Sequence, residues 1–308
     1  MNLLHAAQTY HAAGLPLLPN DAKAKYPVGF KAWEQQNFSL TTLERHIRRG
    51  GALGLRTGNG IEVIDVDTKA WDGPQPDDLH LQYEELLAAN APDVLAKLVI
   101  VRTRSGGRHY LYRCTEVGAN QKLAQRPPTE SEKARAITLI ETRGSGGQVQ
   151  IAPSPGYTLL QGDYAQIPEI TPHERQMVLA CARALHRMVD LPPDRHGPNG
   201  MRPGDHYNNN GGTTEALDLL LHAGWSIARK QGNTVMLTRP GGTRGHIHAT
   251  YGHIAPGVFY PFSSNCAPFE PEKAYQPFTV YALLKSCGEL QSCCQSPTPT
   301  LRPGQHTH

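Results

Sequence analysis

Two aspartates at the end of an apolar segment are the first residues whose types and spacing suggest chemistry. Asp65 and Asp67 close residues 61–67, in which apolar side chains alternate with others. Successive side chains of a β-strand point to opposite faces, so both carboxylates would lie on one face, about 7 Å apart, with Ile64 and Val66 on the other. Two carboxylates at this spacing can bind one or two divalent cations. An ordinary strand running into a polar turn is the alternative.

A pair of glycines with polar neighbours forms a second candidate. Gly106 and Gly107 lie between two expected strands and would let the backbone approach an anion closely. Ser105, Arg108 and His109 add hydrogen-bond donors beside them, which would suit a triphosphate or a phosphodiester. A hairpin turn with an incidental histidine explains the same residues.

A third candidate combines a carboxylate with a guanidinium. Glu141 and Arg143 are two residues apart on an expected strand and would share one face. Glu141 could complete a metal site, and Arg143 could bind phosphate through its planar fork of donors. A surface Glu–Arg pair is the alternative. We expect residues 137–143 and 148–152 to form a strand pair around the glycine-rich residues 144–147.

The surrounding pattern predicts short strands among helices. The tight turn at residues 58–60 is expected to join strands at 54–55 and 61–66. Further strands are expected at 98–103 and 109–113, and helices at 3–13, 40–49, 79–90 and 172–190. The later part of the chain is expected to continue with helix 214–223, short strands at 225–229, 234–238, 246–250 and 258–262, and a helix near 277–287.

Composition limits the class of protein. A chain of 308 residues suggests about two domains, and its 39% hydrophobic and 19% charged residues exclude wholesale disorder. Its 30 basic against 27 acidic residues neither indicate nor exclude nucleic-acid binding. Because no long apolar run and no signal-peptide pattern occur, we expect a cytoplasmic protein without membrane contact.

Shifts in composition predict four segments. Residues 1–190 are expected to form the main domain and 213–290 a small accessory domain. A linker rich in proline, glycine and asparagine is expected at 191–212, and a disordered tail at 291–308.

Four basic residues could contact a nucleic-acid backbone: Lys25, Lys31, Arg229 and Lys230. The first two lie in a basic loop for which simple solvation is the competing interpretation. The last two lie near aromatic residues that could stack on single-stranded bases. Core aromatics beneath a solvated hairpin are the alternative. The aromatics are Trp225, Tyr251, Phe259 and Tyr260.

Taken in chain order, the three candidate segments resemble the bifunctional DNA primase/polymerase (PrimPol) family of the archaeo-eukaryotic primase superfamily. The family's motifs are an acid-x-acid on a strand, a Ser-Gly-Gly-x-His segment, and an acid followed by Arg-Gly, a glycine loop and Ala-Pro-Ser. The matching residues are Asp65, Asp67, Ser105 to His109, Glu141, Arg143, Gly146, Gly147 and Ala152 to Ser154. The resemblance covers residues 3–190, and a weaker one covers 202–285.

The resemblance implies an α+β fold. It would comprise a catalytic core with an RRM-like mixed sheet and flanking helices, plus a small C-terminal α+β domain for which a winged-helix-like arrangement is one candidate. The implied activity is template-dependent DNA polymerase and primase activity by two-metal nucleotidyl transfer, in replication of a phage, plasmid or integrated element. Implied partners are single-stranded DNA template and primer, ribo- or deoxyribonucleoside triphosphates, and a separate helicase.

The resemblance also implies roles for individual residues. Asp65, Asp67 and Glu141 would hold two Mg²⁺ or Mn²⁺ ions. Ser105, the Gly106 and Gly107 amides, Arg108 and His109 would cradle the triphosphate, and His109 would serve catalysis through a phosphate hydrogen bond. Arg143 would neutralise nucleotide phosphates or position the template.

Two departures from the family pattern stand out. Glu141 occupies a position where aspartate is more usual, and Cys114 stands alone near the second motif, so no zinc site is expected. A non-catalytic nucleic-acid-binding replication protein and a metal-dependent nuclease are the alternative functions. The three acids together argue against the first, and the Ser-Gly-Gly-Arg-His segment favours a triphosphate ligand over simple hydrolysis.

Overall fold

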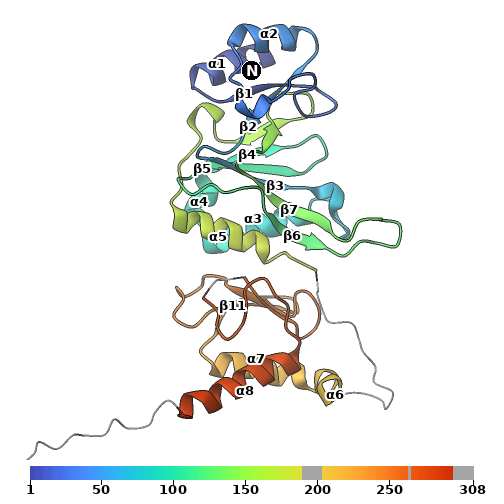
Figure 1. Cartoon of the computed structure of the whole chain (residues 1–308), viewed down its shortest axis with the longest axis vertical. Coiled ribbons are helices and arrows are strands. Elements are labelled where there is room, and N and C mark those ends of the chain that lie inside the picture. The colour runs from blue at the N-terminus through green and yellow to red at the C-terminus, as the bar shows by residue number, and fades with distance from the viewer. Residues whose placement is uncertain (189–202, 263–264, 294–308) are drawn as a thin grey trace, which may run out of the picture. The chain divides into compact units, whose positions relative to one another are not determined.

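The computed structural model describes residues 1–188, 203–262 and 265–293, excluding the side chains of 203 and 286–293. The chain divides into two compact units (Figure 1). The first comprises Met1–Val189 with Gly245–Ile247, and the second Asp190–Arg244 with His248–His308. No helix within the described ranges is long and apolar enough to cross a membrane.

A six-stranded sheet of order β6-β7-β3-β5-β4-β9 forms the centre of the first unit. All its neighbouring strands pair antiparallel, so the expectation of a mixed sheet is wrong. The reason is topological: the helical crossover leads from β3 to β4, but β5 folds back between them. The strands are β3 (Ile61–Val66), β4 (Val99–Arg102), β5 (Arg108–Arg113), β6 (Lys122–Arg126), β7 (Ile137–Arg143) and β9 (Thr158–Gln161).

Helices cover one face of this sheet (Figure 1). They are α3 (Asp78–Asn90), α4 (Pro92–Lys97) and α5 (Pro172–Arg183). Tyr83 of α3 packs against Tyr110 of β5 with ring centroids 5.1 Å apart, and its hydroxyl donates to the Val178 carbonyl of α5 at 3.2 Å. Tyr83 therefore joins α3 both to the sheet and to α5.

A buried ion pair also holds α5 against the sheet. Glu62 of β3 is fully buried and accepts from Arg175 of α5 at 2.5 and 2.9 Å. The hydroxyl of Tyr112 donates to the same carboxylate at 2.6 Å. Because Glu62 and Asp65 are three residues apart on one strand, their side chains lie on opposite faces of the sheet. The helix-covered face thus carries a structural carboxylate and the other face a candidate catalytic one.

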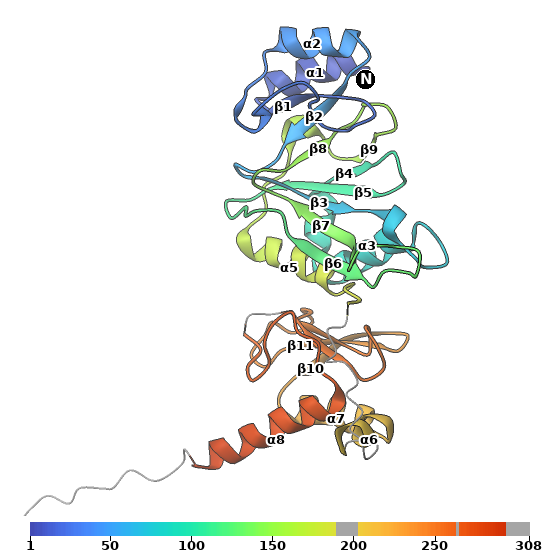
Figure 2. The ribbon, with the colours of Figure 1, turned by 45° about the vertical axis from the view of Figure 1, so that its right-hand side comes forward.

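A second, three-stranded antiparallel sheet of order β1-β2-β8 packs with the N-terminal helices (Figure 2). Its strands are β1 (Leu17–Asn20), β2 (Ala52–Arg56) and β8 (Gln148–Gln150), and the helices are α1 (Leu3–Ala12) and α2 (Leu40–Arg48). One apolar core contains Leu53, Leu55 and Val149 of the small sheet together with Val63 and Leu111 of the large one. The two sheets therefore share a core on the face opposite α3 and α5.

Two predicted strand pairs, one around residues 58–60 and the other around 144–147, are wrong, because these strands pair with other strands. β2 and β8 belong to the small sheet, whereas β3 and β7 belong to the large one. The segments that connect the two sheets, between β2 and β3 and between β7 and β8, lie side by side. The Thr57 amide donates to the Gly147 carbonyl at 3.0 Å, and the Thr57 hydroxyl donates to the Gly144 carbonyl at 2.6 Å. A Cβ on Gly58 would lie 2.8 Å from the Cα of Ser145, so this close approach requires glycine.

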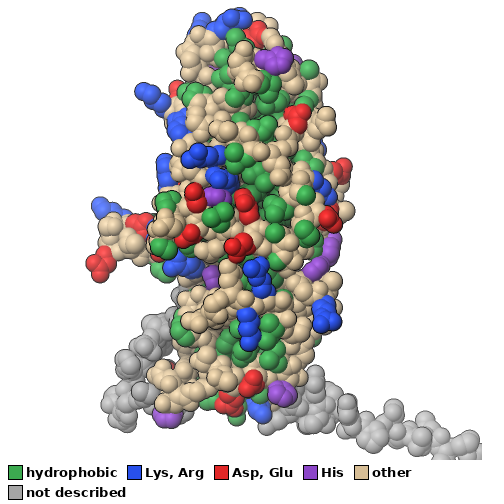
Figure 3. Space-filling view, turned by 180° about the vertical axis from the view of Figure 1, so that it is seen from behind, with side chains coloured by type: hydrophobic (Ala, Val, Ile, Leu, Met, Phe, Trp, Pro, Cys, Tyr) green, Lys and Arg blue, Asp and Glu red, His purple; other side chains and the backbone are tan. Residues whose placement is uncertain are grey.

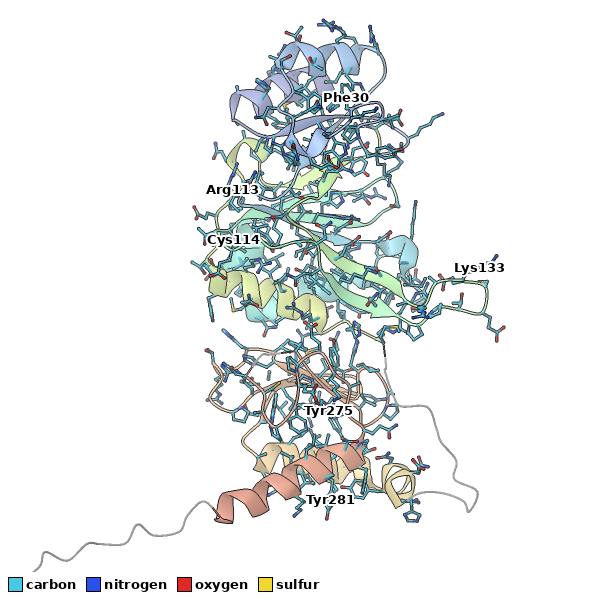
Figure 4. All side chains as sticks on the ribbon, in the orientation of Figure 1. Phe30, Arg113, Cys114, Lys133, Tyr275 and Tyr281 are labelled. Atoms are coloured by element: carbon cyan, nitrogen blue, oxygen red, sulfur yellow. The ribbon has the colours of Figure 1, made fainter. Side chains whose placement is uncertain are left out.

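Shorter elements complete the first unit. Three 3₁₀ helices lie at η1 (Trp33–Gln35), η2 (Thr68–Ala70) and η3 (Tyr164–Gln166). The loop between β6 and β7 projects from the sheet, with Lys133 near its tip (Figure 4).

The second unit is a four-stranded antiparallel meander with three helices among the residues described. Its strands pair in chain order: β10 (Ser226–Gln231), β11 (Thr234–Thr238), β12 (Ala249–Tyr251) and β13 (Phe259–Pro261). The helices are α6 (Pro203–Asn209), α7 (Gly212–His222) and α8 (Pro277–Cys293). The order of elements, with two helices, four consecutive strands and a final helix, differs from the winged-helix-like arrangement named as one candidate.

Part of the expected linker is helical. Asn208 of α6 donates through Nδ2 to Gln276 Oε1 at 2.7 Å, and its Oδ1 accepts from the Phe278 amide at 2.8 Å. The asparagine-rich run therefore contributes to the fold of the second unit. Residues 291–293 of the expected tail end α8. The rest of that tail, and linker residues 191–202, lie outside the described residues.

Candidate active site

Three neighbouring strands bring three of the predicted site residues into register. Asp65 of β3 pairs with His109 of β5 on one side and with Glu141 of β7 on the other. Directly opposed residues of antiparallel strands project from the same face of a sheet. Asp65, His109 and Glu141 therefore meet on the face that α3 and α5 leave uncovered.

Asp65 is the centre of the polar contacts on this face. His109 Nε2 lies 3.5 Å from Asp65 Oδ1, and Arg143 Nη2 lies 3.3 Å from Asp65 Oδ2. The same Arg143 nitrogen donates to Glu141 Oε1 at 2.5 Å. Arg143 thus bridges two carboxylates on adjacent strands.

A cleft opens beside these residues. Of the predicted site residues, it is lined by Lys25, Asp65, Asp67, Ser105, His109 and Arg143. Glu141 reaches this group through Arg143. Lys31 is exposed and is not among the residues that line the cleft. The structure therefore brings most of the first unit's candidates together.

Asp67 closes the strand that carries Asp65. Its backbone amide donates to the Leu139 carbonyl at 2.9 Å, which extends the pairing of β3 with β7. Its side chain accepts from the Lys69 amide at 3.0 Å and so caps η2. This turn places Asp67 and the Lys69 side chain on the same cleft.

The glycine turn between β4 and β5 is built for close approach to β3. The Gly106 amide donates to the Thr103 carbonyl at 3.0 Å, and Gly106 has a φ of +93°. A Cβ on Gly107 would lie 2.3 Å from the Val66 carbonyl oxygen. The Gly106 amide is thus engaged within the turn, which differs from the role in binding triphosphate that we expected for it.

Arg108 is also placed differently from the expectation. Its Nη1 donates to the Gly106 carbonyl at 2.8 Å and to the Gly107 carbonyl at 3.3 Å. It precedes His109 on a strand, so the two side chains project from opposite faces. Arg108 stabilises the turn, while Ser105 and His109 line the cleft.

Alanine at position 107 tests this close approach. We expect Gly107→Ala to lower stability by about 1–3 kcal/mol, because the added methyl group must displace the end of β3 or the turn. Chemical denaturation measures the change. Gly118→Ala is the matched control, since its new Cβ would meet only Gln121 Nε2, at 3.7 Å. Equal stabilities of the two variants would contradict the packing argument.

Burial and neighbouring charges shift the pKa values of three ionisable residues at the cleft. Burial raises the pKa of Asp65, but the hydrogen bond and charge of His109, together with Arg143, outweigh burial and hold this pKa below its usual value. Burial raises the pKa of Glu141 above its usual value, against the opposing charge of Arg143. Burial and the positive charge of Lys69 lower the pKa of Lys25. An anionic ligand would relieve the repulsion between these two lysines.

The donor chemistry of this face suits a divalent cation. Carboxylate oxygens are the ligands that Mg²⁺ and Mn²⁺ prefer. Among the described residues, no three acidic, histidine or cysteine side chains are close enough together to form a complete ligand set. Arg143 instead supplies positive charge to Asp65 and Glu141. A metal ion at these carboxylates would replace that charge and release the guanidinium.

Other cleft residues were not predicted from the sequence. They are Lys69, Thr103, Gln148, Gln150 and Tyr157, with Val66 and Val149. The alternation Gln-Val-Gln at 148–150 was a usable signal, because it indicates a strand with one polar face. Tyr157 follows the Ala-Pro-Ser stretch without a recognisable pattern.

The aromatic residues of the second unit are part of its core. Trp225, Tyr251, Phe259 and Tyr260 are at most 4% exposed, which supports the alternative of core aromatics over that of a stacking platform. Their neighbours Arg229 and Lys230 lie on β10, which stands first in the sheet order, next to β11.

A family model described as "Bifunctional DNA primase/polymerase, N-terminal" matches residues 7–174, more than half of the chain. The chain belongs to the Prim-Pol family. The match spans every strand of the site described above and confirms the resemblance seen in the sequence motifs. No curated protein matches the chain. Family membership gives this Prim-Pol chain a DNA primase/polymerase-type function and the class of a nucleotidyltransferase-type enzyme.

Proposed function

We propose that this Prim-Pol chain synthesises primers and extends them on a DNA template by two-metal nucleotidyl transfer. The observation that carries the proposal is the register of Asp65 with His109 and Glu141, beside a cleft that Asp65 and His109 line together with Lys25 and Lys69. Nucleotidyl transfer requires charge neutralisation and positioning more than covalent chemistry. Carboxylates and cations gathered at one cleft suit that requirement.

The carboxylates would hold the metal ions. Asp65, Asp67 and Glu141 supply oxygen donors from β3, its end and β7. Bound Mg²⁺ or Mn²⁺ would neutralise the triphosphate and promote attack by the primer 3′-oxygen. Arg143, released from Glu141, would then bind the phosphates of the nucleotide or position the template.

The remaining cleft residues would bind the triphosphate. Lys25 and Lys69 would attract it, and the Ser105 hydroxyl would donate to it. His109 is held by Asp65 and is 5% exposed, so its ring is fixed before a ligand arrives. A ring that is already fixed loses little entropy on binding, which favours a positioning role for His109.

Single-stranded template and primer are the proposed macromolecular ligands. Acidic and basic side chains are interspersed on the face of the first unit seen in Figure 3. We therefore expect DNA affinity to depend on the cleft and on scattered residues such as Lys31, Arg229 and Lys230, and to fall with added salt. Family resemblance supports a place in replication of a phage, plasmid or integrated element with a separate helicase.

Primer extension with and without metal tests the proposal. We expect extension of a primed DNA template with dNTPs and Mn²⁺ or Mg²⁺, its loss on addition of EDTA, and its recovery when metal is restored in excess. DNA binding without extension would favour the non-catalytic replication protein. Metal-dependent shortening of the primer would favour the nuclease.

A further inference from the structure

The side-chain amide of Gln150 is buried at the cleft without a hydrogen-bond partner. Gln150 lies on β8, lines the cleft and is 2% exposed. Neither its Oε1 nor its Nε2 has a partner among the described residues. A buried amide that makes no hydrogen bond destabilises the fold, so a retained one requires an explanation.

Gln148 shows what a structural glutamine in this strand does. It precedes Gln150 by two residues, so both side chains project from the same face of β8. Gln148 Oε1 accepts from Asn20 Nδ2 at 2.9 Å, and Gln148 Nε2 donates to the Lys25 carbonyl at 2.7 Å. Gln148 thereby fixes the segment that carries Lys25. Gln150 has no such structural role.

A second cleft residue has an unpaired atom. His109 uses Nε2 toward Asp65, while its Nδ1 is buried and has no partner among the described residues. Residues with unpaired polar atoms therefore line the cleft together with the cations Lys25, Lys69 and Arg143. These two kinds of group suit different parts of one ligand.

The chemistry of a nucleotide assigns these parts. Its phosphates are anions and match the lysines and arginine. The pairing edge of its base must face the template in a template-dependent reaction, so a protein side chain cannot occupy that edge. The sugar hydroxyls remain, and each can both donate and accept a hydrogen bond, as an amide can.

We infer that Gln150 hydrogen-bonds a sugar hydroxyl of the incoming nucleoside triphosphate and thereby influences the choice between ribo- and deoxyribonucleotides. The 3′-hydroxyl is present in both, and the 2′-hydroxyl only in ribonucleotides. The inference rests on the proposed function and adds a residue that recognises the sugar. Burial of Gln150 makes this contact selective, because a nucleotide lacking the hydroxyl leaves the amide unpaired.

Binding measurements test the contact without requiring turnover. Calorimetry with the full chain and Mn²⁺ would compare dGTP, GTP, 2′,3′-dideoxy-GTP and inorganic tripolyphosphate. We expect the wild type to bind dGTP about five- to tenfold more tightly than the dideoxynucleotide. In Gln150→Leu this difference should disappear, with tripolyphosphate affinity unchanged. A changed ratio of GTP to dGTP affinity would give the contribution of the 2′-hydroxyl.

Two controls separate recognition from damage. Gln150→Leu removes an unpaired amide, so its melting temperature without nucleotide should equal or exceed that of the wild type. Gln150→Met repeats the measurement if the leucine variant does not fold. Gln161→Leu, at a residue that does not line the cleft, should lower the melting temperature, because it breaks the hydrogen bonds from its Nε2 to the Leu95 and Leu98 carbonyls, and should keep the preference for dGTP over the dideoxynucleotide.

Several outcomes would overturn the inference. One is equal binding of dGTP and the dideoxynucleotide by the wild type. Another is a dGTP preference that survives in Gln150→Leu, or an equal loss of tripolyphosphate affinity. An effect of the substitution confined to one base among dATP, dCTP, dGTP and dTTP would assign Gln150 to the base instead. A wild type that binds none of the probes would defeat the proposed function itself, and the inference with it.

Discussion

Replacing Asp65 by asparagine is expected to reduce the rate of primer extension by at least about a hundredfold. Asp65 lies between His109 and Glu141 in the sheet and contacts Arg143. The substitution preserves the size of the side chain and removes its negative charge. That charge would bind a metal ion, and it attracts His109 and Arg143. Rates from a gel-based extension assay at saturating Mn²⁺ and dNTP would measure the loss.

Two comparisons show whether this loss concerns the site. Asp93→Asn alters an exposed aspartate in the first turn of α4 and should keep wild-type activity. Circular dichroism should show that Asp65→Asn remains folded. A folded Asp65→Asn variant that extends primers at the wild-type rate would remove Asp65 from the catalytic machinery and leave the proposed metal site without its central ligand.

Local pattern was sufficient to find the strand that carries Asp65. Alternation of apolar and acidic residues predicted residues 61–66 as a strand, and β3 has these bounds. The Ser-Gly-Gly segment was correctly placed between two strands, because turn chemistry is local. The same alternation rule, applied to Arg108 and His109, would have shown that only one of these adjacent side chains faces Asp65.

Contacts between segments far apart in the chain could not be predicted from the sequence. Nothing in residues 144–152 indicates that β8 leaves β7 and pairs with β2 in another sheet. Gln150 could therefore be assigned to a strand but not to the wall of the cleft. The partner of Glu62 was equally hidden, since Arg175 is 113 residues away in the chain. A glutamate within an apolar strand signals only that some partner must exist.

The second large effect concerns this buried pair. Arg175→Met is expected to lower the free energy of unfolding by about 3–5 kcal/mol, because Glu62 would remain buried without its cation. Without Arg175, the hydrogen bond from the Tyr112 hydroxyl to that carboxylate would remain, but it carries no positive charge. Urea denaturation followed by circular dichroism gives the change. Lys97→Met is the matched control, because Lys97 of α4 forms an ion pair with Glu174 of α5. This pair is partly exposed, so we expect a loss of at most about 1 kcal/mol.

Removing both charges distinguishes a strong attraction from a desolvation effect. If the cost of Arg175→Met comes from an uncompensated buried carboxylate, Glu62→Met combined with Arg175→Met should recover most of the lost stability. The Tyr112 hydroxyl would lose its acceptor in the double variant, so recovery should be incomplete. A double variant as unstable as Arg175→Met would show that α5 depends on the pair itself. Because Glu62 and Asp65 share β3, we also expect the recovered variant to extend primers, whereas a shifted strand would lose extension as well as stability.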